Sequence, residues 1–413
     1  MSHIDDLIRQ HCPNGVEHRF LGEVGQFERG SGIQKSDFVE SGVGCIHYGQ
    51  IHTHYGTWAT ETKSFVTPEQ AARTRRAKAG DLVVATTSED DEAVGKAVAW
   101  LGADEVAVST DAFIYRHSLD PKYVSYFFQT EQFHSQKRRH ITGTKVRRIG
   151  GGALAKIRVP VPPLDVQREI VRVLDLFQEL EAELEAELEA RRRQYSHYRD
   201  ALLTFERERV RWVMLGEAGA LFGGLTGKSK ADFQAGGARY VSYMNVFENI
   251  ATDVAPDDRV SVGQGERQRR LERGDILFTG SSETPGECGM SSVLTLDPPD
   301  PLYLNSFCIG YRLHDREMLD PEFAKHLFRS ASMRDQIVRT ANGVTRFNVS
   351  KRRLAKIAVP VPDADEQRRI AGILDKFDSL VNDLSVGLPA ELKARRAQYE
   401  YYRDRLLTFE EAA

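Results

Sequence analysis

Two long stretches of the chain carry apolar side chains at helical spacing on an otherwise charged background. In residues 161–206 the apolar positions recur every three or four residues, which predicts a helix of about 40 residues with one apolar face. Residues 361–413 repeat this stripe, but Gly387 and Pro389 fall inside it and predict a break or kink near Leu388. The chain therefore contains two related helical segments, the second interrupted.

The two stripes match closely enough to predict that the helices pair with each other. The alternative is that each helix packs on its own globular domain. The first stripe consists of Leu174, Phe177, Leu180, Leu184, Leu188, Tyr195, Tyr198, Leu202 and Phe205. The second consists of Leu374, Phe377, Leu380, Leu384, Leu392, Tyr399, Tyr402, Leu406 and Phe409.

The remaining segments have short β-rich runs separated by Gly and Asp turns, for example residues 82–85, 97–100 and 276–278. They predict two small, mixed, mainly β domains. The alternating Val and Pro at 159–162 and 359–362 exclude helix and central strand, and indicate stiff extended linkers. The expected boundaries are a first domain at 1–160, a helix at 161–206, a second domain at 207–360 and a helix at 361–413.

The second half of the chain repeats the first. Residues 154–177 and 354–377 share 15 of 24 positions, and residues 191–206 and 395–410 share 12 of 16. Between these matches the offset grows from 200 to 204 residues. The difference equals one unit of the tandem ELEA array at residues 179–190, which adds about 6 Å of helix per repeat.

The charge is unevenly distributed. Residues 163–206 hold 6 basic and 11 acidic residues, and residues 363–413 hold 8 and 11, so the two stretches carry −5 and −3. Because the whole chain carries −4, the rest carries +4. The acidic charge is thus predicted on the helices and a modest basic excess on the globular domains, which is compatible with a nucleic-acid partner.

Sequence motifs for catalysis are missing. The sequence has no GxxxxGK[ST] loop, HExxH, GxSxG elbow or GxGxxG fingerprint, and DPPD at Asp297 lacks the fourth-place aromatic of a methyltransferase loop. The acidic run at 89–92 is interpreted as a solvated loop, and the four dispersed cysteines as reduced structural thiols. Because these motifs are missing, we expect that the chain catalyses nothing. Because no apolar run of 18 residues occurs, we expect a cytoplasmic protein that does not bind a membrane.

The duplicated unit resembles a known family. A β-rich domain, then VPVPPLxxQ, then a long helix ending RRxQYxxYRDxLLTF, followed by the whole unit again, is similar to the DNA-specificity subunit of type I restriction-modification enzymes. The resemblance implies an α+β fold with two mainly β target-recognition domains, each followed by a long helix. The two helices would pair as an antiparallel coiled coil with pseudo-twofold symmetry, suited to an asymmetric target split into two half-sites.

The resemblance also implies partners. They would be double-stranded DNA, two adenine-methyltransferase subunits docked on the helices, and restriction or translocase subunits. No cofactor is expected in this chain, whereas S-adenosylmethionine, ATP and Mg²⁺ would belong to the partners. A related role is the specificity chain of a methyltransferase-nuclease fusion. Two functions of different classes also stay open: a self-contained DNA-modifying enzyme, and a coiled-coil scaffold with two sugar- or protein-binding β domains.

Direct reading of bases needs side chains that present paired donors and acceptors, such as Gln or Asn to adenine and Arg or Lys to guanine. The alternative for each candidate is an ordinary core or surface role. In the first domain the candidates are Lys35, Tyr48, Gln50, His52, Ser88, Lys145 and Arg147. In the second they are Lys230, Tyr243, Asn245, Ser282, Arg346 and Asn348, mostly the aligned counterparts.

Overall fold

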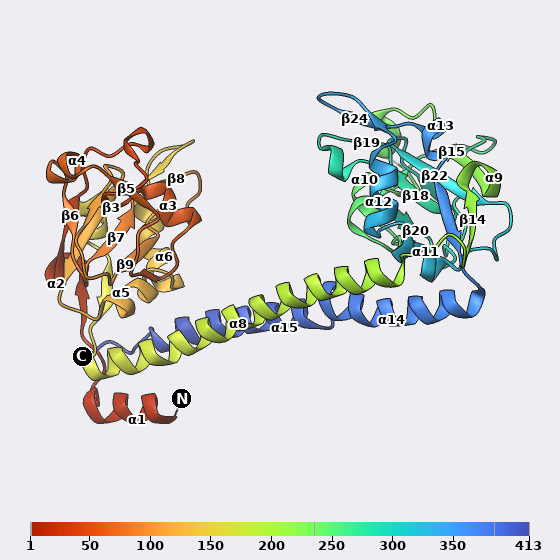
Figure 1. Cartoon of the computed structure of the whole chain (residues 1–413). Coiled ribbons are helices and arrows are strands. Elements are labelled where there is room, and N and C mark those ends of the chain that lie inside the picture. Colours follow the sequence, from red (N-terminus) through yellow and green to blue (C-terminus); the bar gives the residue numbers. More distant parts are fainter. Residues whose placement is uncertain (1, 235, 384, 413) are drawn as a thin grey trace. The chain divides into compact units, whose positions relative to one another are not determined.

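The chain folds into two compact units, each built from a globular domain and parts of the helices (Figure 1). The computed structural model describes residues 2–234, 236–383 and 385–412. Unit 1 comprises Met1–Glu185 with Leu392–Ala413, and unit 2 comprises Ala186–Glu391. The last residues of the chain therefore belong to the same unit as the first.

The centre of unit 1 is a five-stranded sheet in the order β2 (Gly25–Arg29), β11 (Ala112–His117), β7 (Leu82–Ala85), β9 (Ala97–Trp100) and β4 (Trp58–Ala59). All four residues of β7 are buried, because both faces of the sheet are covered. Leu82 and Val84 belong to one hydrophobic core, and Val83 and Ala85 to another, as the alternation of side chains along a strand requires.

A second sheet of four strands completes the β part of the first domain. Its strands lie in the order β5 (Ser64–Val66), β3 (Val43–Ile46), β10 (Val106–Val108) and β6 (Arg76–Ala77). A short two-stranded sheet pairs β8 (Thr87–Ser88) with β12 (Arg147–Arg148). The helical elements are α1 (Ser2–His11), α2 (Leu21–Val24), η1 (Lys35–Asp37), α3 (Tyr48–Thr53), α4 (Pro68–Ala72), α5 (Pro121–Phe127), α6 (Glu131–Lys137), η2 (Arg138–His140) and α7 (Gly151–Leu154).

The Val-Pro segments are extended, as predicted, but they are not free linkers. β13 (Arg158–Pro160) pairs antiparallel with β1 (His18–Phe20), and β25 (Ala358–Val361) pairs with β14 (Arg211–Met214). Both strands of a two-stranded sheet are edge strands, and proline is tolerated there because a missing N–H need not break a ladder.

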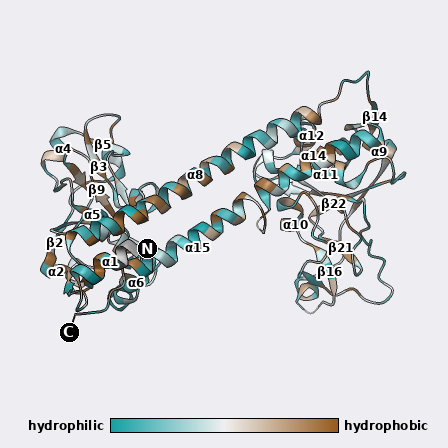
Figure 2. Cartoon of the chain, turned by 90° about the horizontal axis from the view of Figure 1, so that it is seen from below, coloured by the Kyte–Doolittle hydropathy of each residue, from teal (hydrophilic) through white to brown (hydrophobic). Residues whose placement is uncertain are grey.

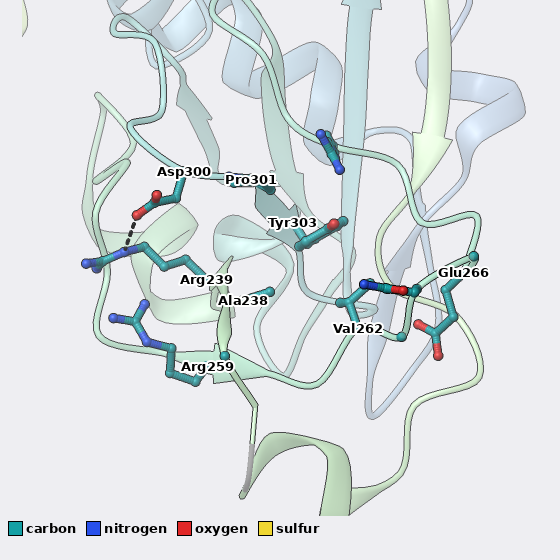
Figure 3. Close-up of a pocket in the computed structure, with 13 residues that line it drawn as sticks. Ala238, Arg239, Arg259, Val262, Glu266, Asp300, Pro301 and Tyr303 are labelled. Carbon is teal, nitrogen blue, oxygen red and sulfur yellow. Dashed lines mark ion pairs between the residues drawn. The ribbon is translucent and has the colours of Figure 1, made fainter.

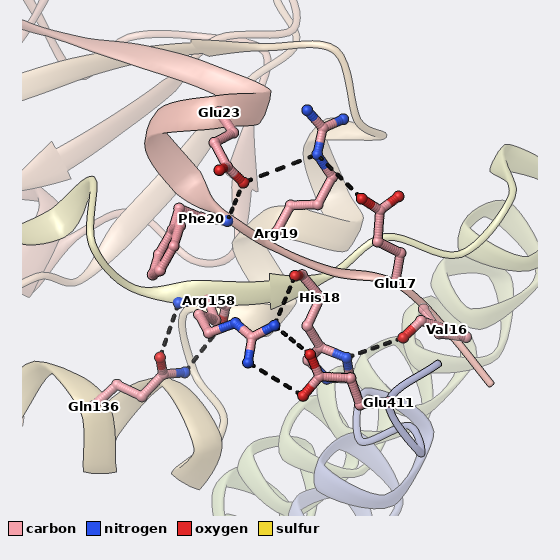
Figure 4. Close-up of polar contacts among 9 residues, drawn as sticks. All are labelled: Val16, Glu17, His18, Arg19, Phe20, Glu23, Gln136, Arg158 and Glu411. Carbon is pink, nitrogen blue, oxygen red and sulfur yellow. Dashed lines mark hydrogen bonds and ion pairs between the residues drawn. The ribbon is translucent and has the colours of Figure 1, made fainter. Parts of the chain in front are cut away.

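The C-terminal segment is held against the first domain (Figure 4). The Val16 amide donates to the Glu410 carbonyl at 2.8 Å, and the Ala412 amide donates to the Val16 carbonyl at 3.1 Å. Arg158 donates to the His18 carbonyl at 3.0 Å and also pairs with the Glu411 carboxylate. Residues near the two ends of the chain are thus joined through β1 and β13.

Unit 2 repeats the plan. Its main sheet has the order β15 (Gly219–Gly223), β22 (Cys308–Leu313), β18 (Ile276–Thr279) and β20 (Ser291–Val293). Two three-stranded sheets follow, β17 (Arg259–Val260), β16 (Ala238–Val241) and β21 (Leu302–Leu304), then β19 (Ser281–Ser282), β24 (Phe347–Val349) and β23 (Ala341–Asn342). The helical elements are α9 (Leu215–Ala218), η3 (Lys230–Phe233), α10 (Tyr243–Glu248), η4 (Pro285–Glu287), α11 (Pro321–Leu327), α12 (Ala331–Val338) and α13 (Lys351–Leu354).

The first predicted long helix is α8 (Leu164–Leu202), which continues without a break through the ELEA array. The second is divided into α14 (Ala364–Asn382) and α15 (Leu388–Leu406). Gly387 has φ +90, a conformation that side-chain-bearing residues rarely adopt, and Pro389 stands in the first turn of α15, where its missing N–H costs nothing. The interruption predicted from these two residues is confirmed.

Within unit 1, α8 and α15 run antiparallel. Phe177 stacks on Tyr402 with ring centroids 5.5 Å apart, and Arg396 Nε lies 2.6 Å from Glu181 Oε1. The same part of α8 also docks on its own domain, because Asp175 accepts hydrogen bonds from Lys122 and Tyr126 at 2.7 Å each. Helix pairing and packing on the globular domain, which the sequence left as alternatives, occur together.

Within unit 2, the end of α8 packs on α14 and α11. Tyr198 stacks on Phe377 at 5.5 Å, and the Tyr195 hydroxyl lies 3.2 Å from His326 Nδ1. Asp375 contacts His326 Nε2 at 2.6 Å and Lys325 Nζ at 2.7 Å. Burial raises the pKa of Asp375, but hydrogen bonds from His326 and Lys325 more than offset this effect and hold the pKa below its usual value.

The predicted stripe is buried only in part. Leu174, Leu188, Tyr195, Leu374, Leu392, Tyr399 and Leu406 are buried, and Phe177, Leu184, Leu202, Phe205, Phe377, Tyr402 and Phe409 are half-buried. Leu180 and Leu380, at equivalent positions, are exposed, and so is Tyr198 despite its stacking contact. Leu384 lies outside the described residues. Figure 2 shows hydrophobic residues interspersed with hydrophilic ones along α8, as expected when only one face is covered.

Candidate functional site

Three candidate residues of the first domain, Tyr48, Gln50 and His52, lie on α3, which begins one residue after β3. His47 caps the helix, and its Nδ1 accepts from the Gly49 amide at 3.2 Å. Gln50 Oε1 accepts from the His47 amide at 3.0 Å, while Gln50 Nε2 donates to Ser64 Oγ at 2.7 Å. Gln50 is buried and its amide is engaged on both sides, so in this structure it caps the helix, and its role in reading a base stays a prediction.

Tyr48, His52 and Ser88 are brought together beside this helix. Tyr48 is half-buried, and its amide donates to Ser109 Oγ at 2.9 Å. His52 Nε2 lies 3.0 Å from the Thr87 carbonyl, next to Ser88. Burial lowers the pKa of His52, so the ring is neutral at pH 7 and donates from Nε2 to that carbonyl. Its Nδ1 is then a buried acceptor, to which none of the described residues donates a hydrogen bond.

Arg147 joins this group through strand pairing, because it stands opposite Ser88 in the β8–β12 register. Its Nε lies 2.8 Å from Asp91 Oδ1, and its Nη1 donates to the Gly143 carbonyl at 2.7 Å. The acidic run at 89–92 therefore includes the counter-ion of Arg147. The run also covers Lys137, whose Nζ donates to the Glu92 carbonyl at 2.5 Å and whose pKa burial lowers to about 8.

The hairpin that leads into β12 carries Lys145 at an exposed position. Gly143 has φ +92 there, and a Cβ on it would meet the Val146 carbonyl oxygen at 2.1 Å. The turn consequently requires glycine. Lys35, also exposed, lies apart on η1, but close enough to His47 to contribute to lowering the pKa of that histidine, for which burial is the larger cause.

The second domain repeats this arrangement around α10. Asn245, the counterpart of Gln50, is buried. Its Nδ2 donates to the Asp253 carbonyl at 3.0 Å, and its Oδ1 accepts from the Asp253 amide at 3.1 Å and from Asn249 Nδ2 at 3.2 Å. Asn245 therefore fixes a turn in this structure, and, as for Gln50, its role in reading a base stays a prediction.

Tyr243, Ser282 and Arg346 are brought together at one cavity of about 390 Å³. The Tyr243 hydroxyl donates to the Ser281 carbonyl at 2.9 Å, and Arg346 Nε lies 3.4 Å from Ser281 Oγ. Ser282 stands opposite Phe347 in the β19–β24 register, which places the hairpin with Arg346 beside the cavity. Asn348 is exposed on the same strand, and Lys230 is exposed on η3 without joining the cavity.

Three apolar residues of this cavity were missed by sequence reasoning. Met244 and Phe247 come from α10, and Phe307 directly precedes β22. Phe307 is 61% exposed and Met244 is 49% exposed, which is unusual for large apolar side chains beside a hollow. Alignment of the two domains could have revealed them, because the first domain has Gly49, His52 and Asp111 at the positions of Met244, Phe247 and Phe307.

A larger cavity of about 690 Å³ lies elsewhere in the second domain, between β16, β17 and β21 (Figure 3). It is lined by Arg239, Arg259 and Arg270, together with Glu266 and Asp300. Arg239 is already engaged, because its Nη1 donates to the carbonyls of Ala255 and Pro256 at 2.6 and 2.7 Å. Arg270, one of three arginines within residues 267–270, thus borders this cavity and not the one lined by Arg346.

Within the described ranges, no group of three or more His, Cys, Asp or Glu side chains is placed to hold a metal ion. In the same part of the chain, no helix is both long and apolar enough to cross a membrane.

Comparison with known proteins gives one family. The sequence model described as "Type I restriction modification DNA specificity domain" matches residues 13–190 and 264–394. The specificity subunit of the type I restriction enzyme EcoR124I/EcoR124II from Escherichia coli is 32% identical over 305 residues, which cover 70% of each chain. A type I restriction enzyme specificity subunit assigned in Haemophilus influenzae is 29% identical over 282 residues, 65% of this chain and 68% of that protein.

Solved structures have the same fold. A chain from a structural study of complex assembly and conformational transition in the type I R-M system aligns with a TM-score of 0.61 at 16% identity, over 96% of this chain and 98% of that chain. The HsdS subunit from Thermoanaerobacter tengcongensis aligns with a TM-score of 0.50 at 18% identity, over 96% and 97%. At these identities the likeness concerns the fold alone.

Proposed function

Because the chain belongs to the type I restriction modification DNA specificity domain family, we propose that it is the DNA-reading, non-catalytic subunit of a type I restriction-modification enzyme. Its two globular domains, at residues 1–160 and 207–360, read two separate half-sites of double-stranded DNA. Methyl transfer to adenine from S-adenosylmethionine, and ATP- and Mg²⁺-dependent translocation and cleavage, belong to partner subunits.

One observation supports this proposal above the others: the two domains share a scaffold but present different side chains at matching positions. Tyr48 of α3 corresponds to Tyr243 of α10. Each domain also has a short strand with a serine, Ser88 in β8 or Ser282 in β19. A hairpin opened by a positive-φ glycine, Gly143 or Gly343, pairs with that strand in both domains. On this common frame the side chains differ, for example Gly49 against Met244 and His52 against Phe247, and such variation is what two different base sequences require.

The helices are proposed to dock two methyltransferase subunits. Leu180 on α8 and Leu380 on α14 occupy equivalent positions, and both are exposed, so each repeat leaves an apolar side chain available to a partner. Leu176 is a third exposed leucine on α8. The duplicated position of Leu180 and Leu380 supports one subunit per repeat.

The proposal is tested by selection from randomised duplex DNA with the full chain bound to its methyltransferase subunits. The expected result is a split target, with two different half-sites separated by a gap of unread bases. Recovery of one contiguous palindrome, or of no motif, would contradict it.

A further inference from the structure

The cavity bounded by Met244, Phe247 and Phe307 differs in kind from the matching surface of the first domain. Tyr243 and Phe247 stack with centroids 6.0 Å apart and form one wall. Phe307 is held by its backbone, because its amide donates to Asn305 Oδ1 at 2.8 Å and its carbonyl accepts from the Gly280 amide at 2.8 Å. The backbone that carries the exposed ring is therefore held by hydrogen bonds on both sides.

The first domain has no large apolar side chain at the same places. His52 stands where Phe247 does, Gly49 where Met244 does, and Asp111, the residue before β11, where Phe307 does. The two domains therefore share a fold but differ at these three positions, where only the second domain presents large apolar side chains. An apolar surface gains free energy only by removing another apolar group from water.

The acidic residues of the cavity limit what can approach it. Glu283 and Glu287 line it on one side, and the Glu287 carboxylate accepts from Thr284 Oγ1 at 2.5 Å. Two carboxylates repel a phosphate, so the sugar-phosphate backbone is a poor occupant. The edge of a base pair carries no net charge, and Arg346 beside the same cavity can donate to an adjacent base.

We propose that this cavity reads the 5-methyl group of a thymine in the major groove, and that Phe307 and Met244 are the residues that determine this preference. The inference rests on the proposed function and names the base chemistry of the second half-site. Among the four base pairs, only those with thymine place an apolar group in the major groove. The polar first domain has no equivalent apolar surface at the matching positions and does not require a thymine methyl there.

The test replaces each thymine of the selected second half-site, one at a time, by deoxyuridine, which removes only the methyl group. At one position we expect the full chain with its methyltransferase subunits to bind about fourfold more weakly, as estimated for one buried methyl group. The Phe307→Ala variant should bind the thymine and deoxyuridine duplexes equally. Phe307→Leu, which keeps an apolar side chain, should retain part of the difference.

The matched control is Leu296→Ala, which removes another highly exposed apolar side chain of the same domain. It should leave the thymine preference unchanged. If a split target is selected but its second half-site contains no thymine, or no thymine there is distinguished from deoxyuridine, this inference is overturned while the proposed function stands. If Phe307→Ala keeps the full discrimination, the cavity is not the reader. Selection of no motif overturns both.

Discussion

Asn245 shows how a single buried side chain can hold a short helix in place. Its amide bridges the end of α10 to the Asp253 backbone, where both donor and acceptor are satisfied. Truncation removes these hydrogen bonds to the amide and carbonyl of Asp253, which are part-buried contacts, and also the one from Asn249. Asn245 is therefore a positioning residue for the neighbouring Met244 and Tyr243.

We expect Asn245→Ala to lower the free energy of unfolding by about 1–3 kcal/mol, because three part-buried hydrogen bonds are lost. Asn348→Ala serves as the control, because Asn348 is exposed and makes only a 3.4 Å contact with the Arg346 carbonyl, so its cost should stay within about 0.5 kcal/mol. Urea denaturation of the full chain measures both. If Asn245→Ala leaves the stability unchanged but alters the bases selected in the second half-site, the positioning role is contradicted and Asn245 is a base-reading residue.

These amides also mark the limit of prediction from residue type. Gln and Asn are the expected adenine readers, yet Gln50 and Asn245 each stand in the first turn of a short helix and are used by the local backbone. Residue type alone could not distinguish the two uses, because both depend on the same donor and acceptor. Phe307 was missed for a related reason. A single aromatic residue before a β-rich segment predicts a core position, and its exposure becomes visible only in the tertiary structure.

At the level of elements, the helical parts were the most predictable. The apolar spacing predicted α8, and Gly387 with Pro389 predicted the interruption before α15, because local chemistry determines both. The pairing of the Val-Pro segments with β1 and β14 was not predictable, since it joins residues about 140 positions apart. Local patterns do not specify contacts at such separations.

The ELEA array in α8 gives a prediction about spacing. The array is helical throughout, so deleting one unit, residues 183–186, shortens the helix by about 6 Å. Against the 3.4 Å rise of DNA per base pair, the preferred gap should shrink by about one or two base pairs. The control exchanges Glu183→Ala and Ala186→Glu, which keeps the length and composition. Selection of targets from random DNA measures the gap, and altered half-site bases with an unchanged gap would contradict the prediction.

At the scale of the whole molecule, each globular domain has its own hydrophobic cores, so the two can change independently. We expect that replacing residues 207–360 by the matching domain of another family member changes the second half-site only. The first half-site and the gap should be retained, because the first domain and α8 are untouched. Target selection with the chimaera checks this result. A simultaneous change in the first half-site would show that the domains do not read independently.

The placement of the last residues has a consequence for the order in which the chain matures. Residues 392–413 complete unit 1, where Glu410 and Ala412 bond to Val16. Unit 2, residues 186–391, lies entirely upstream of them. During synthesis the ribosome therefore releases every residue of unit 2 before the final residues of unit 1 emerge. The domain made first must wait until residues 392–413 have been made to acquire these contacts, whereas the domain made second can finish folding earlier.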